Sequence, residues 1–166
     1  MARFGDINVT LSVLDRLVDE DPKNQAEVPL SRAQSVRMLK GAVRRDLGWL
    51  LNTRRISEEP DETLKELNRS LYLYGLPDLS TYNVASSADQ AKLIRHLSST
   101  IKLFEPRLAN IRIVQAEPPS STGLREVKLR IEGILLMDPS PEPISFDTTI
   151  ELKSGICRLT GDANAG

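Results

Sequence analysis

The sequence has little of the chemistry on which most enzymes and metal sites depend. Its 166 residues include one cysteine, Cys157, and one histidine, His96. A single cysteine cannot form a disulfide within the chain, so a cytoplasmic protein is the default expectation. No second histidine or thiol stands near His96 in the sequence to complete a metal site, and no glycine-rich phosphate loop is present. We therefore predict neither a metal nor a cofactor.

Long apolar runs are also missing. No stretch approaches the roughly 18 apolar residues of a membrane-spanning helix, and residues 1–6 lead into no signal-peptide core. We expect no direct membrane insertion. The formal net charge of −1 argues against nucleic acid as a main partner, and no aromatic side chains interleave with the basic ones to stack bases.

The length of 166 residues suits one domain that can bury a core. With 40% hydrophobic and 27% charged residues, the composition is that of an ordinary soluble domain. We predict a leader over residues 1–30, a single α+β domain over 31–160 and a flexible tail over 161–166. Within the leader, Val13, Leu14 and Leu17 favour a short helical hook, because Leu14 and Leu17 would share one side of a helical turn.

Helical patterns fill the N-terminal half. Ser31 and Gln34 have the spacing of a capping box, which predicts where the first long helix begins, and Asn52 is a plausible end. Its apolar positions predict one buried face: Val36, Leu39, Val43, Leu47 and Leu50, broadened by Trp49 and Leu51. Gly41 and Gly48 are costly inside a helix, which suggests a close backbone approach there.

Two more helices are predicted before the strands. A short one follows an acidic linker, and its apolar positions are Leu64, Leu67 and Leu71. A second capping box, formed by Ser86 or Ser87 with Gln90, predicts the start of the next helix. That helix must stop near Phe104, because the residue preceding a proline is pushed out of the α region.

Strand patterns fill the C-terminal part. Val127, Leu129 and Ile131 alternate with charged residues, which indicates one buried and one wet face. Gly133 suggests a bulge or bend. With a loop over residues 120–123 and return strands after a proline-rich turn, we predict an α+β fold: N-terminal helices packed on a small antiparallel sheet of three to four strands. An exposed edge invites pairing with another chain, and we expect it within residues 111–115, 144–152 or 156–160.

The segment Glu105-Pro106-Arg107-Leu108 lies where helices give way to strands. The proline ring fixes φ, so the charged groups of Glu105 and Arg107 flank a stiff turn. Phe104 and Leu108 provide apolar anchors on either side. Two interpretations are open: an exposed salt bridge that contributes little, or a docking point for a partner protein.

The first long helix is basic on its outer face and at its end. Between positions 32 and 55 the only acidic residue is Asp46. The candidate partner-binding residues are Arg44, Arg45, Arg54 and Arg55. Three interpretations are open for these arginines. They could be solvated, they could bind an acidic partner, or they could form ion pairs with the acidic linker at 57–62.

An apolar chain reversal supplies the remaining candidates. Its residues are Tyr74, Gly75, Leu76, Pro77 and Asp78. Glycine and proline two positions apart predict an abrupt turn. A loop with so many apolar side chains is expected to pack against the domain.

An enzyme would need a different arrangement. Glu105 and Asp147 could be nominated as the carboxylate pair of a glycoside hydrolase. Arg107, two residues away, would stabilise the charged form of Glu105, which is the wrong direction for a general acid. We therefore predict a protein without catalytic activity.

Three segments in a fixed order carry a resemblance to a known family. They are RRDLGWLLNTRR at 44–55, YGLPDL at 74–79 and FEPRL at 104–108. Together they closely resemble TssE, the family of baseplate wedge subunits of the bacterial type VI secretion system. That family is similar in turn to wedge proteins of contractile phage tails, some of them labelled lysozyme-like. The resemblance extends over nearly the whole chain.

The resemblance implies a structural protein of the cytoplasm. Its expected partners are the wedge subunits TssF and TssG, joined through a core bundle in which Glu105, Pro106 and Arg107 take part. Sheet edges would receive the first ring of the contractile sheath, made of TssB and TssC, by β-strand addition. The alternatives are a carbohydrate-cleaving enzyme that uses Glu105 as its acid, and a phage-derived tail wedge protein.

Overall fold

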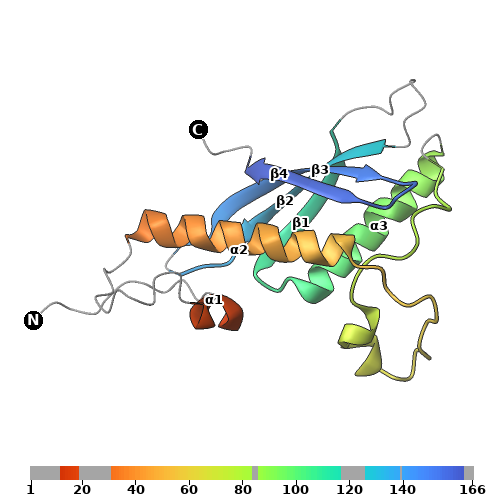
Figure 1. Cartoon of the computed structure of the whole chain (residues 1–166), viewed down its shortest axis with the longest axis horizontal. Helices are drawn as coiled ribbons and strands as arrows, with labels where there is room; N and C mark the ends of the chain where they lie inside the picture. The colour runs from red at the N-terminus through yellow and green to blue at the C-terminus, as the bar shows by residue number, and fades with distance from the viewer. Residues whose placement is uncertain (1–11, 19–30, 84–85, 117–125, 139, 163–166) are drawn as a thin grey trace, which may run out of the picture.

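The computed structural model describes residues 12–18, 31–83, 86–116, 126–138 and 140–162. The helical elements in chain order are α1 (Val13–Leu17), α2 (Arg32–Asn52), the 3₁₀ turns η1 (Leu67–Arg69) and η2 (Leu71–Leu73), and α3 (Ser87–Phe104) (Figure 1). They are followed by the strands β1 (Leu108–Gln115), β2 (Glu126–Leu135), β3 (Glu142–Glu151) and β4 (Cys157–Asp162). The predicted loop at 120–123, most of the predicted leader and residues 163–166 lie outside the described residues.

Helix α2 begins and ends as the sequence predicts. The Gln34 backbone N–H donates to the Ser31 hydroxyl at 3.3 Å, and the Ser31 N–H donates to the Gln34 side chain at 2.9 Å. The apolar face is buried as expected, with one exception. Trp49 is 52% exposed, and the Arg45 guanidinium lies 5.0 Å from the centre of its ring. Placing Trp49 on the buried face was therefore wrong.

The prediction of a close backbone approach at the α2 glycines was also wrong. Apart from the adjoining backbone of α2 itself, no heavy atom of the described residues lies within 4 Å of where a Cβ on Gly41 or Gly48 would stand. Both positions therefore have room for a larger residue.

The short helix predicted around Leu64 does not form. The turns η1 and η2 take its place, and Leu64 and Leu71 are both exposed. Polar side chains instead bind the local backbone: Asp61 accepts from the Thr63 N–H at 2.8 Å, and the Asn68 amide donates to the Asp61 carbonyl at 2.9 Å. Because no apolar face of this segment is buried, an α-helix here gains too little stability to compete with these local hydrogen bonds.

Helix α3 is capped one residue earlier than the second capping box required. Ser86 is the cap and accepts from the Asp89 N–H at 3.3 Å, so Gln90 does not complete the box. The Asp89 carboxylate accepts instead from the Asn83 N–H at 3.0 Å. The helix ends at Phe104, as the following proline dictates.

The strands form one four-stranded antiparallel sheet in the order β1-β2-β3-β4, which confirms the α+β prediction. Alternate side chains of β2 and β3 are buried under the helices. Helix α3 packs on β1 and α2 packs on β4 (Figure 1). Because β3 is paired on both sides, the predicted candidate edge at 144–152 was wrong. The edge strands of the described sheet are β1 and β4.

A β-bulge lies opposite Gly133. Ala109 pairs with Ile134 and Arg112 with Glu132, so Asn110 and Ile111 together face Gly133 alone. Asn110 has a φ of 52°, the left-handed conformation that asparagine tolerates better than most residues. The suggested bulge is thus confirmed, with the extra residue in the neighbouring strand.

The apolar loop after η2 packs against the end of α2, as predicted. Leu76 and Leu79 are fully buried. The Leu76 N–H donates to the Thr53 carbonyl at 2.8 Å, and the Arg55 N–H donates to the Leu76 carbonyl at 3.0 Å. Gly75 has a φ of 105°, and a Cβ there would stand 2.4 Å from the Thr53 oxygen. Only glycine therefore fits between these two segments.

Gly41→Ala is expected to raise the free energy of unfolding by about 0.5–1 kcal/mol, because alanine restricts the unfolded chain and meets no neighbour in the helix. Gly75→Ala is the matched control and should lower it, because its φ and the Thr53 carbonyl both exclude a side chain. Urea unfolding of the two variants measures both effects. A destabilised Gly41→Ala would show that α2 needs glycine there for packing.

Candidate assembly site

The corner between α3 and β1 places a carboxylate inside the protein. Glu105 is the residue that caps α3, with its N–H donating to the Ile101 carbonyl at 2.8 Å. It is only 3% exposed, and Leu108, which opens β1, is buried at 6%. Pro106 is exposed at the tip of the turn. The corner therefore buries its acid and presents its proline.

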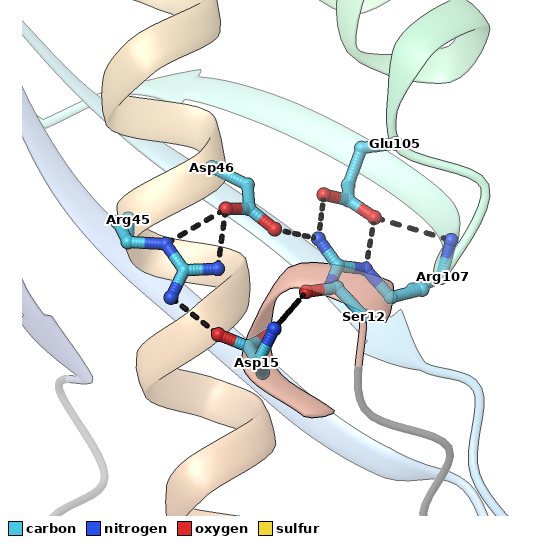
Figure 2. A network of polar contacts seen from close by, with 6 residues as sticks. All are labelled: Ser12, Asp15, Arg45, Asp46, Glu105 and Arg107. Atoms are coloured by element: carbon cyan, nitrogen blue, oxygen red, sulfur yellow. Dashed lines mark hydrogen bonds and ion pairs between the residues drawn. The ribbon is translucent and has the colours of Figure 1, made fainter. Parts of the chain in front are cut away.

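Arg107 neutralises the buried acid. Its Nε donates to Glu105 Oε1 at 2.6 Å and its Nη2 to Glu105 Oε2 at 2.5 Å, a two-pronged pairing of guanidinium with carboxylate (Figure 2). These hydrogen bonds raise the pKa of the Arg107 guanidinium against the opposing effect of burial, so the arginine stays charged. Because Glu105 is buried, the pair is not the exposed salt bridge that one interpretation proposed.

Asp46 of α2 extends the pairing across the domain. Its Oδ2 accepts from Arg107 Nη2 at 2.6 Å, and its Oδ1 accepts from Arg45 Nε and Nη2 at 3.0 and 2.9 Å (Figure 2). Sequence reasoning did not assign Asp46 a role. Its position as the only acid among the basic residues of α2 was the available signal.

Arg45 joins the N-terminal helix to this chain of charges. Its Nη1 donates to Asp15 of α1, which also accepts from the Ser12 hydroxyl at 2.6 Å. These hydrogen bonds, that from Arg45 foremost, lower the pKa of Asp15 to about 2. The apolar residues of α1 are exposed, with Val13 at 67% and Leu17 at 77%. The described contacts of α1 with α2 are therefore polar.

We call this set of side chains the charge chain. It comprises Asp15, Arg45, Asp46, Arg107 and Glu105, in which acids and bases alternate (Figure 2). It links α1, α2 and the corner. Glu105 is its buried end, whereas Asp46, Arg107 and Arg45 keep 22–35% of their side chains exposed. A partner can therefore reach the middle of the charge chain from solvent.

The other predicted arginines are distributed differently. Arg54 donates from Nη2 to the Ser154 carbonyl at 3.0 Å and lies across Gly155 in the β3–β4 turn. Arg55 donates to Glu59 at 2.7 Å, which matches the alternative of pairing with the acidic linker. Arg44 is exposed and has no ion pair within the described residues. Arg44 and Arg54 are both exposed, but only Arg54 has a described hydrogen bond to the sheet.

The apolar loop reaches the charge chain through Tyr74. Its ring meets Phe104 edge to face at 5.2 Å. Burial raises the pKa of the Tyr74 hydroxyl, with a further contribution from the charges of Asp46 and Glu105. Gly75 and Leu76 are buried and serve the packing of the loop, whereas Asp78 is exposed and binds Ser80. Partners can reach this loop at Pro77 and Asp78.

The two carboxylates nominated for catalysis are not brought together. Glu105 is paired with Arg107 on the helical side of the sheet, whereas Asp147 accepts from Arg130 at 2.7 Å on the opposite face. Among the described residues, no cluster of three or more potential ligands could hold a metal ion. In the same part of the chain, no helix has the length and apolar character needed to cross a bilayer.

Comparison with known proteins places most of the chain in a described family. The family model described as baseplate wedge protein gp25 matches residues 37–140, more than half of the 166 residues. The matched segment runs from α2 to the turn after β2 and contains Arg45, Asp46, Glu105 and Arg107. No curated protein and no solved structure matches the chain.

Arg107→Ala is expected to lower the free energy of unfolding by about 3–5 kcal/mol, because it leaves Glu105 buried without a cation. The double variant Glu105→Gln with Arg107→Met removes both charges at similar volume and should recover much of that loss. Urea unfolding of the wild type and both variants measures the difference. An Arg107→Ala loss below about 1 kcal/mol would mean that water, and not Arg107, satisfies Glu105.

Acid is expected to release α1 from α2. The pKa of Asp15 is lowered from 3.8 to about 2, so its ion pair stabilises the attached state fully above pH 3.8 and is lost as the pH falls toward 2. A carboxyl NMR titration should give Asp15 a pKa of about 2. Arg45→Gln should return it toward 3.8. Titration near that ordinary value in the wild type would contradict the attachment.

Proposed function

This chain belongs to the gp25 family of baseplate wedge proteins, and on that premise we propose that it is a structural wedge subunit of a type VI secretion baseplate. In this role it docks to TssF and TssG and initiates the sheath of TssB and TssC in the cytoplasm. The observation that carries the proposal is the match of the family model over residues 37–140, which hold every member of the charge chain except Asp15. The order of the three motif segments supports the secretion setting.

The corner is the proposed docking point for the other wedge subunits. Pro106 stands exposed at its tip, while Glu105 and Arg107 fix the direction of the turn from inside. A rigid element loses little conformational entropy on binding. Arg45 and Asp46 present their exposed sides next to it, so the partner surface would be polar and would complement alternating charges.

Arg44 and Asp78 are proposed as outer contacts of the same interface. Both are exposed, and Arg44 has no ion pair within the described parts of the chain. Exposed charges steer association and are screened over about 8 Å at physiological salt. Their contribution to binding should therefore weaken as salt rises.

Initiation of the sheath would use the unpaired edges of the sheet. β1 and β4 each have a neighbour on one side only in the described structure. Main-chain hydrogen bonds at such an edge continue into an added strand. A phage tail baseplate would use the same contacts, and the genes next to this one distinguish the two settings.

Pro106→Asp tests the docking proposal. It puts a charge at the exposed tip without removing any member of the charge chain. It should raise the Kd for TssF and TssG about tenfold, equivalent to about 1.4 kcal/mol, and so lower the amount of both that co-purifies. Ala91→Asp puts the same charge at an exposed position of the first turns of α3 and is the matched control. Equal recovery of both variants, with equal thermal stability, would exclude the corner as the docking point.

A further inference from the structure

The end of α2 closes one edge of the sheet. The Asn52 side-chain amide donates from Nδ2 to the Cys157 carbonyl at 2.9 Å, and its Oδ1 accepts from the Cys157 N–H at the same distance. A side chain thus makes both hydrogen bonds that a residue of a neighbouring strand would make. Nδ2 also donates to the Gly48 carbonyl at 2.8 Å, which ties the amide to its own helix.

The hydrogen-bond pattern shows which β4 positions face outward. The Glu151 N–H donates to the Ile156 carbonyl, so in an antiparallel ladder Arg158 and Thr160 also face β3. Cys157 and Leu159 therefore direct their backbone N–H and carbonyl groups away from β3, toward the open edge. The Asn52 side chain already binds the outward backbone groups of Cys157. The pairing register with β3 shifts after Thr160, where β4 has a bulge. Leu159 is the single regular position left for an added strand.

Strand β1 has a longer edge that is unpaired within the described part of the chain. The Ala116 N–H donates to the Lys128 carbonyl, so Val114 and Arg112 also face β2. Ile113 and Gln115 therefore direct their N–H and carbonyl groups away from the sheet. The register is regular from Arg112 to Gln115, past the bulge at Asn110. β1 therefore offers an added strand two successive outward-facing residues, Ile113 and Gln115, with no bulge between them.

Side chains at this edge define what can bind. Ile113 is partly buried and packs against the core on the helical side, whereas Gln115 at the end of the strand is exposed. An added strand would place alternate side chains beside Ile113 and under α3. The fitting partner is therefore an extended segment with apolar residues on one face and polar residues on the other.

We propose that β1 is the edge that accepts the sheath strand, and that Asn52 keeps β4 closed to pairing. This inference rests on the proposed function, because the partner is the strand that the sheath supplies. β1 also lies inside the segment matched by the gp25 model, whereas β4 lies outside it. When one edge of a sheet is covered by a side chain and interrupted by a bulge, strand pairing is restricted to the other edge.

Hydrogen exchange on the wild-type chain tests the choice of edge without a variant. The chain bound to TssF and TssG is compared before and after addition of TssB and TssC. The amides of Ile113 and Gln115 should exchange at least tenfold more slowly after addition, and that of Leu159 should not change. Protection at Leu159 without protection at Ile113 and Gln115 would overturn the choice of β1.

Proline variants separate this inference from the proposed function. Gln115→Pro removes an outward donor of β1 and should abolish sheath initiation, whereas Gln115→Ala should preserve it. Leu159→Pro, with Leu159→Ala as its control, should leave initiation intact. Initiation lost only in Leu159→Pro would overturn the choice of edge and keep strand addition. Initiation intact in every variant that remains folded, with no exchange protection at either edge, would overturn strand addition itself.

Asn52→Ala tests the closing role of the amide. It frees the outward groups of Cys157 and should increase self-association of the purified chain relative to wild type, measured by light scattering. Asn52→Asp keeps the acceptor for the Cys157 N–H but places a carboxylate oxygen opposite the Cys157 carbonyl, so it should give an intermediate effect. An unchanged size distribution in Asn52→Ala would overturn the closing role.

Discussion

A carboxylate buried at the corner between helices and sheet is the constraint on which the rest of the structure depends. Glu105 is almost without solvent contact, and a buried charge is tolerated only with a partner of opposite sign. Arg107 supplies that partner, and Asp46 holds Arg107 against α2. Through Arg45 the same chain reaches Asp15 and α1. The need to neutralise one buried carboxylate thus holds together segments that are far apart in the sequence.

The corner also connects the proposed wedge contact to the sheet. The Arg107 carbonyl accepts from the Leu136 N–H at 2.8 Å, so the residue that neutralises Glu105 also begins the pairing of β1 with β2. Leu108 follows immediately as the first residue of β1. A subunit bound at the exposed proline would therefore lie beside β1, whose outer edge is unpaired within the described residues. Docking and sheath initiation would share one rigid segment.

Local signals in the sequence predicted much of the fold. The Ser31 capping box, the stop before Pro106 and the alternation of Val127, Leu129 and Ile131 depend on neighbours within a few residues. Features that depend on distant residues were missed or misjudged. How wide the buried face of α2 is depends on the distant segments that pack on it, and Trp49, which was predicted to broaden that face, is exposed instead.

The candidate site was predicted in part for the same reason. The corner was identified from its proline and flanking charges, but its main partner on α2 is 61 residues away in sequence. No periodicity links Asp46 to Arg107, and none links the Asn52 amide to Cys157 across 105 residues. Such contacts follow from the packing of α2 against the corner and β4. Sequence patterns therefore located the segments that matter without showing which side chains join them.

The most direct test of this account is a double-mutant cycle between Asp46 and Arg107. The free energy of unfolding is measured for the wild type, Asp46→Asn, Arg107→Gln and the double variant. If the charge chain is one coupled unit, the two substitutions should be non-additive, with a coupling energy of about 1–3 kcal/mol. Additivity to within about 0.3–0.5 kcal/mol would show that the two residues act independently, and it would contradict the account.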